Sequence, residues 1–163
     1  MTYYSDLSEY TYHNGMFWRP GTKNVGWLAV EHPFPQAVPS EHVLDRIWQF
    51  CKVSIAQMRG LHDCEWCSCE AYRAERNGET LLLSTSEVRV FSRNGEIYAA
   101  PTLIYHYMKA HHYAPPEPFL AAVEHGPCPP DPAFFARLAE LDLEWNPTSK
   151  TAGPRRRSEP PAK

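Results

Sequence analysis

The sequence predicts an α+β domain in which a small antiparallel meander and about four helices are stapled by a Cys2His2-type zinc site. Runs of β-favouring residues alternate along the chain with amphipathic helical patterns. Asn94-Gly95 lies between two such runs and is a strong hairpin signal. The third observation is the pair Cys64-x2-Cys67. A predicted helix that contains His106 and His111 follows it about forty residues later.

The first predicted elements are an aromatic arm, a short strand and a helix. Residues 1–22 are rich in Tyr and Trp, and we interpret them as an arm whose rings cover the core; an exposed aromatic binding surface is the alternative. Residues 25–30 form an apolar, β-favouring run that the prolines of residues 32–35 end. Ser40 is a suitable N-cap for a helix over residues 41–52, which has one apolar face.

The second half of the chain predicts a hairpin followed by helices. Strands are predicted over residues 80–84, 87–91 and 97–100, and the Asn94-Gly95 turn is expected to place both of its residues at positive φ. The charged residues 70–79 are interpreted as a surface excursion. Capping residues, prolines and apolar periodicity predict helices over residues 101–112, 117–125 and 131–142.

The candidate metal site contains more ligand types than a tetrahedral ion needs. Cys64, Cys67, His106 and His111 would close the shell around a structural Zn²⁺ and leave no position for substrate. Helical phase places His111 within the apolar stripe of its helix and His106 at the edge of that stripe. Further candidates lie beside these four, namely His62, Cys69 and His112. We expect His62 to orient a ligand, and either His62 or Cys69 to be the alternative ligand.

Other interpretations of these residues stay open. A redox pair is one alternative, although the flanking residues lack the strand-then-helix pattern of thioredoxin-like motifs. Ordinary buried thiols and core histidines are a second alternative. The third is an incompletely closed metal site, at which His62 and Glu65 would serve hydrolysis by a metal-bound water.

Several segments resemble an uncharacterised family of small bacterial proteins, a domain of unknown function. The similar segments are residues 6–10 (DLSEY), 24–28 (NVGWL), 32–34 (HPF), 59–67 (RGLHDCEWC), 87–90 (EVRV), 97–101 (IYAAP) and 106–107 (HY), with His111, Tyr113, Pro115, Pro116 and Phe119. The resemblance covers roughly residues 4–125. It implies a recurring polar set of His62, Cys64, Cys67, His106 and His111, whereas Cys69 and His112 are peculiar to this chain. It implies no activity.

Length and charge limit the classes of protein that fit. The 163 residues predict one globular domain over residues 1–146 and a disordered, basic, Pro- and Arg-rich tail over residues 147–163. The whole chain has a net charge of −3; the tail carries five basic residues and one acidic residue, so residues 1–146 carry −7. An acidic body makes nucleic acid an unfavourable principal ligand.

The sequence predicts a cytoplasmic protein without a membrane segment. The amino end lacks the basic and apolar regions of a signal peptide, and no stretch approaches about 18 apolar residues. Five cysteines, three of them clustered, do not suit a secreted disulfide framework.

We favour a non-enzymatic interaction or adaptor function with a protein partner. A metal-dependent hydrolase is the second interpretation and a nucleic-acid-binding zinc protein is the third. In the tail, Arg155, Arg156 and Arg157 form a candidate binding segment, although such short basic runs usually only increase solubility. The pathway, the identity of the partner and the oligomeric state do not follow from the sequence.

Overall fold

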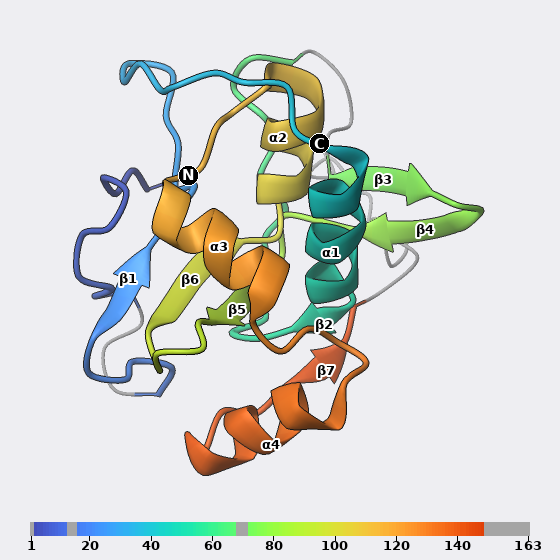
Figure 1. The fold of residues 1–163 in the computed structure, drawn as a ribbon. Coiled ribbons are helices and arrows are strands. Elements are labelled where there is room, and N and C mark those ends of the chain that lie inside the picture. Colours follow the sequence, from blue (N-terminus) through green and yellow to red (C-terminus); the bar gives the residue numbers. More distant parts are fainter. Residues whose placement is uncertain (1, 13–15, 68–71, 149–163) are drawn as a thin grey trace, which may run out of the picture.

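The computed structural model describes residues 2–12, 16–67 and 72–148, and it has the expected α+β architecture (Figure 1). Its four helices within these ranges are α1 (Glu41–Cys51), α2 (Ile104–His111), α3 (Glu117–His125) and α4 (Pro132–Glu140). The strands are β1 (Thr22–Asn24), β2 (Val53–Ser54), β3 (Arg73–Arg76), β4 (Glu79–Leu82), β5 (Glu87–Phe91), β6 (Ile97–Pro101) and β7 (Asn146–Pro147). The predicted fold class is therefore confirmed.

A three-stranded sheet in the order β1-β6-β5 forms the centre of the molecule. Strands β5 and β6 pair antiparallel, with Arg89 opposite Ala99, and every residue of both strands is buried. Strand β1 instead pairs parallel to β6, so the sheet is mixed rather than a purely antiparallel meander. Helices α1 and α3 both pack against β5 and bury the sheet, and α1 also packs against α2 (Figure 1).

Helix α1 forms as its sequence pattern predicts. The side-chain oxygen of Ser40 accepts a hydrogen bond from the Val43 amide at 3.2 Å, which satisfies one of the otherwise unpaired N–H groups of the first turn. The predicted apolar face is buried in full, and within it the Trp48 ring packs against Tyr105 of α2 with ring centroids 5.0 Å apart. Removing such faces from water is the main favourable term in folding.

The strand predicted over residues 25–30 is wrong, because the chain turns at Gly26. This glycine has φ +74°, a conformation that a strand does not use. Its amide donates to Asp6 Oδ1 at 2.9 Å instead of to a neighbouring strand. A side chain at this position would also approach Ile104 Cδ1 to 3.1 Å. The segment is still largely buried, so the apolar pattern indicated burial correctly and secondary structure incorrectly.

The two Asn-Gly pairs within the described ranges, Asn77-Gly78 and Asn94-Gly95, form different turns. In Asn77-Gly78 both residues have positive φ (+50° and +77°) and join β3 to β4 by a two-residue loop. Residues 70–79 were predicted as a surface excursion without a strand. Within them, residues 73–76 instead form β3, the first strand of this hairpin, and they do lie at the surface. At Asn94-Gly95 only Gly95 has positive φ, and its amide donates to the Ser92 carbonyl at 3.2 Å. The second loop is therefore a longer turn with a glycine bulge, and the predicted geometry there is wrong.

The chain remains paired beyond the residue at which the predicted tail begins. Strand β7 pairs antiparallel with β2, which places Pro147 opposite Val53. The next residue, Thr148, is buried; its hydroxyl donates to the Cys51 carbonyl at 2.6 Å and its amide to the Lys52 carbonyl at 3.0 Å. None of the helices in residues 2–12, 16–67 and 72–148 has the length and apolar character that a membrane span needs.

Candidate metal centre

Four side chains from two distant segments converge in one cluster. Cys64 and Cys67 come from the loop between β2 and β3, and His106 and His111 come from α2. Their ligand atoms, two Sγ and two imidazole nitrogens, all lie within 4.8 Å of one another. No other such group of three or more Cys, His, Asp or Glu side chains occurs in the described ranges. We call these four residues the Cys2His2 cluster.

The two cysteines are brought together by a tight turn. The Cys67 amide donates to the Cys64 carbonyl at 3.4 Å, so the loop folds back over the two intervening residues. Cys64 is buried and Cys67 is half-buried. Between them, the Trp66 ring packs edge-on against Tyr107 of α2 and at a tilt against His111, with centroid distances of 5.8 and 5.7 Å. These contacts dock the cysteine loop on the helix that carries the histidines.

Two histidines five residues apart on α2 reach one site. Five residues do not return to the same side of a regular helix, which repeats every 3.6 residues. His111 is the last helical residue, and His112 then adopts the left-handed conformation with φ +54°. His106 and His111 nevertheless approach each other through their side chains, with their Nε2 atoms 3.2 Å apart. The imidazole of the exposed residue His112 is not part of the cluster.

The shortest distances between ligand atoms of the cluster come close to those around a tetrahedral Zn²⁺ and fall slightly below them. Zn–S bonds of about 2.3 Å and Zn–N bonds of about 2.0–2.1 Å imply ligand atoms roughly 3.3–3.8 Å apart in a regular tetrahedron. Cys64 Sγ and Cys67 Sγ each lie 3.2 Å from His111 Nε2, and Cys67 Sγ lies 3.4 Å from His106 Nε2. The donor set of two thiolates and two imidazoles also matches zinc in its chemistry.

Hydrogen bonds alone account poorly for this arrangement. The Nε2 atom of His111 lies 3.2 Å from three polar atoms, on Cys64, Cys67 and His106. A single imidazole nitrogen carries either one proton or one lone pair, so it serves one such partner well. A metal ion at the centre would satisfy all four groups together.

Burial keeps both imidazoles in the form that binds metal. Desolvation, with the neighbouring His111 as the second cause, lowers the pKa of His106 to about 4. Desolvation and then the proximity of His112 lower the pKa of His111 below its ordinary value. Metal ligation requires neutral imidazole, so near neutral pH no proton has to be removed from either ring before it binds.

The remaining predicted site residues lie elsewhere. His62 is not brought into the cluster; its amide donates to Ser84 Oγ at 2.9 Å and it lines a separate cavity. Glu65, the candidate base of the hydrolase interpretation, accepts a hydrogen bond from the Val30 amide at 2.9 Å. Cys69 and the arginines Arg155, Arg156 and Arg157 lie outside the described residues.

The fold and the cluster together define a small α+β domain with a candidate Cys2His2 metal centre. The family model of the Domain of unknown function (DUF7919) matches residues 2–124, which include all four ligand residues. The chain belongs to this family, which confirms the expected membership of an uncharacterised family. No curated protein and no solved structure matches the chain.

Proposed function

We propose that the Cys2His2 cluster binds one structural Zn²⁺ ion and that the protein is a small, zinc-stabilised interaction or adaptor protein of the bacterial cytoplasm. The observation that carries this proposal is the convergence of four zinc-type ligand atoms within 4.8 Å of one another. Thiolates persist as ligands in a reducing compartment, which supports the cytoplasmic part of the proposal.

A structural role fits the cluster better than a catalytic one. Four protein ligands close the zinc shell, whereas catalytic zinc sites keep three and leave a position for water. The two residues on which a hydrolase would depend are placed unfavourably, since His62 lies outside the cluster and Glu65 is bonded to the Val30 amide. The ion would then join the loop of Cys64 and Cys67 to α2 across the core.

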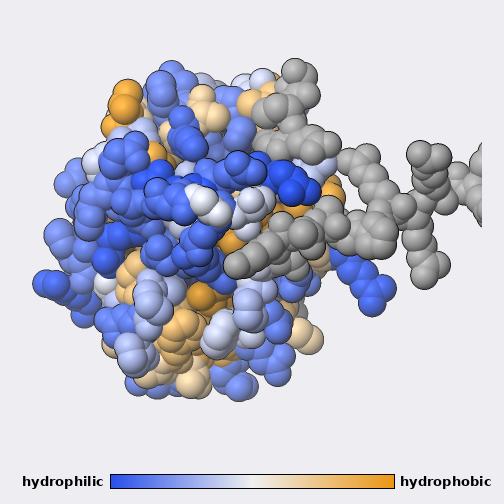
Figure 2. All heavy atoms as spheres, turned by 90° about the vertical axis from the view of Figure 1, so that its right-hand side faces the viewer, coloured by the Kyte–Doolittle hydropathy of each residue, from blue (hydrophilic) through white to orange (hydrophobic). Residues whose placement is uncertain are grey.

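A protein partner suits the surface better than nucleic acid does. Residues 1–146 carry a net charge of −7, which opposes binding to a phosphate backbone. Figure 2 shows a largely hydrophilic face around the level of the β3–β4 hairpin, with apolar residues gathered lower down, at the level of α4 and β7. Among the exposed apolar side chains is Trp145, with 41% of its surface accessible, and Trp is enriched at protein interfaces.

Metal content of single variants tests the proposed zinc site. The variants Cys64→Ser and Cys67→Ser should each contain much less than one zinc ion per chain, because a hydroxyl is a poor replacement for a thiolate. Cys51→Ala is the matched control, since Cys51 is also buried but lies in α1 outside the cluster. It should retain one zinc per chain by elemental analysis of protein purified without added metal. Full zinc content in both CxxC variants would contradict the proposed ligands.

A further inference from the structure

The β3–β4 hairpin is a two-stranded sheet that stands apart from the central sheet (Figure 1). It projects from the body beside α1, and Arg76 ties it to that helix. Arg76 Nη2 lies 2.8 Å from Glu41 Oε2 and 2.6 Å from Asp45 Oδ1. The hairpin is therefore held in a defined place relative to α1, although no further strand covers its edges among the described residues.

The register of the hairpin determines which backbone groups face outward. In an antiparallel pair of strands, every second residue exchanges hydrogen bonds with the residue opposite. The Leu83 amide donates to the Tyr72 carbonyl at 2.5 Å, so the even-numbered residues of β3 are those that bond to β4. The N–H and C=O groups of Arg73 and Glu75 therefore point away from β4 and have no hydrogen-bond partner among the described residues. We call these outward groups the β3 edge.

The residues of the β3 edge also carry opposite charges. The side chains of Arg73 and Glu75 are exposed and, two residues apart, share the face of the hairpin that Arg76 does not use. No ion pair within the described ranges includes either of them. Charged side chains usually protect an edge strand from pairing. A strand that presents the opposite charge at each position removes this obstacle, because the charges then attract.

A second copy of β3 is such a strand in one register only. Outward groups must meet outward groups, so an antiparallel pair of β3 edges is centred on Arg73, on Ala74 or on Glu75. Centring on Arg73 places two arginines opposite each other, and centring on Glu75 places two glutamates opposite each other. Centring on Ala74 instead places Arg73 of each copy opposite Glu75 of the other. This register also pairs every N–H and C=O group of both β3 edges.

We infer that β3 is the interface of a symmetric dimer, in which the β3 edges of two copies pair antiparallel about Ala74 and join the two hairpins into one sheet. Both copies use the same surface, as closed two-fold dimers do. The other edge of the hairpin suits this role less well. Its outward residues are Thr80 and Leu82, which carry no charge, and Leu82 is only 8% exposed. This interface goes beyond the proposed zinc function and does not depend on it.

Self-association of the full chain as purified is the first test. Sedimentation velocity from micromolar to millimolar concentration should show a reversible equilibrium between monomer and dimer. In NMR of the ¹⁵N-labelled chain, amide hydrogen exchange at Arg73 and Glu75 should slow as the dimer forms, because these amides gain acceptors. The Thr80 amide, which faces outward on the other edge, is the internal control and should exchange at a constant rate. A chain that stays monomeric, or protection at Thr80 instead of at Arg73 and Glu75, would overturn the inference.

Charge reversal makes the test specific to the proposed register. Arg73→Glu and Glu75→Arg should each raise the dissociation constant of the dimer at least about tenfold, because two attractive cross-strand pairs become two repulsive ones. An equimolar mixture of these two variants should dimerise again, since opposite charges then face each other in the mixed dimer. The double variant Arg73→Glu/Glu75→Arg should likewise recover the original dissociation constant to within about threefold.

A matched control separates the register from overall charge. Arg59→Glu changes the net charge of the chain as Arg73→Glu does, but Arg59 is an exposed residue outside the hairpin. This variant should dimerise as the unsubstituted protein does. Equal weakening by Arg59→Glu and Arg73→Glu would overturn the inference. So would a failure of both the mixture and the double variant to recover the dimer.

Discussion

Each ligand of the Cys2His2 cluster is held by a different local constraint. The Cys64 thiol is buried, whereas Cys67 depends on the turn that its amide closes. His106 lies inside α2, and His111 depends on where that helix ends. Metal binding in such a cluster is coupled to folding, since the unfolded chain does not keep these groups together. The loss of any one ligand is therefore expected to affect both metal affinity and stability.

Substitutions of His106, His111 and His112 distinguish the two candidate metal ligands from a neighbouring histidine outside the cluster. His106→Ala and His111→Ala should each lower the free energy of unfolding by several kcal/mol, as much as a CxxC substitution does. His112→Ala should cost no more than about 1 kcal/mol, because its imidazole lies outside the cluster and only its left-handed backbone opposes alanine. Urea unfolding of the three zinc-loaded variants measures this.

An enzyme would show a different pattern from these substitutions. One histidine variant would then keep its metal and its stability while losing a hydrolytic activity of the unsubstituted protein. That result would contradict the scaffold interpretation. If His111→Ala had no effect and His112→Ala lost the metal, only the choice of ligand between these two histidines would be contradicted.

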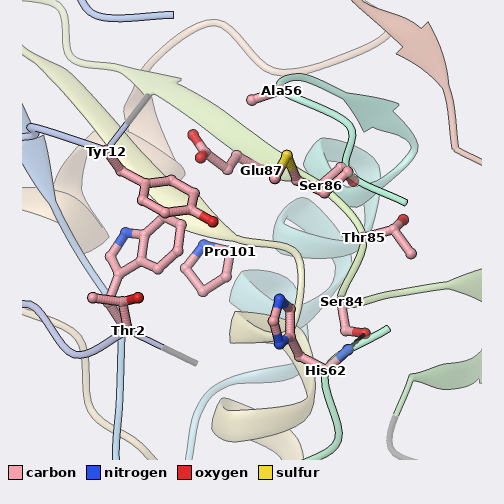
Figure 3. A pocket seen from close by; sticks show the side chains of 11 residues that line it. Thr2, Tyr12, Ala56, His62, Ser84, Thr85, Ser86, Glu87 and Pro101 are labelled. Atoms are coloured by element: carbon pink, nitrogen blue, oxygen red, sulfur yellow. Dashed lines mark hydrogen bonds between the residues drawn. The ribbon is translucent and has the colours of Figure 1, made fainter. Parts of the chain in front are cut away.

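At the scale of single residues, spacing and helical phase pointed to the four residues whose side chains the fold brings close enough to hold a metal. They did not predict where His62 lies. It belongs to a loop, and a loop has no regular repeat from which the direction of a side chain can be inferred. The cavity that His62 lines (Figure 3) depends on side chains from Thr2 to Pro101. Such long-range proximity follows from the topology of the chain and has no signature in local sequence.

At the scale of elements, Asn77-Gly78 and Asn94-Gly95 show what the residues of a turn can and cannot specify. Asn94-Gly95 marked its hairpin correctly, whereas the hairpin at Asn77-Gly78 was not predicted, although both pairs connect antiparallel strands. The number of loop residues, however, is set by the register of the strands on either side. Asn77 must adopt positive φ because its loop has two residues, whereas Asn94 lies in a longer loop and does not.

Alanine substitution distinguishes the two turns. Asn77→Ala should lower the free energy of unfolding by about 1 kcal/mol, because alanine opposes positive φ more strongly than asparagine does. Asn94→Ala, with ordinary φ, should cost clearly less. Chemical denaturation of both variants checks the difference. Equal costs would mean that the two loops share one turn type.

The pairing of β2 with β7 also yields a prediction. A chain ending at Asn146 loses Pro147 and the two hydrogen bonds of Thr148, whereas a chain ending at Thr148 keeps them. The shorter chain should be less stable by about 1–3 kcal/mol, because the carbonyl groups of Cys51 and Lys52 lose their donors. Thermal unfolding of the two truncations compares them directly. Equal stability would contradict a structural role for Thr148.

At the scale of the whole molecule, composition and periodicity predicted the α+β class and the helices, because apolar faces at helical spacing must be buried somewhere. They did not predict that β1 pairs parallel to β6, which joins segments more than seventy residues apart. Nor did they predict the turn at Gly26, where tertiary contacts with Asp6 and Ile104 decide the backbone conformation.

The proposed zinc site consists of Cys64, Cys67, His106 and His111, which would hold one ion in a closed shell. X-ray absorption spectroscopy of the protein as purified tests this claim most directly, because it reports the metal and its ligands together. We predict one zinc per chain, with two sulfur atoms at about 2.3 Å and two imidazole nitrogens at about 2.0–2.1 Å. Substoichiometric metal, or a zinc shell with fewer than two sulfur atoms or fewer than two imidazoles, would contradict it.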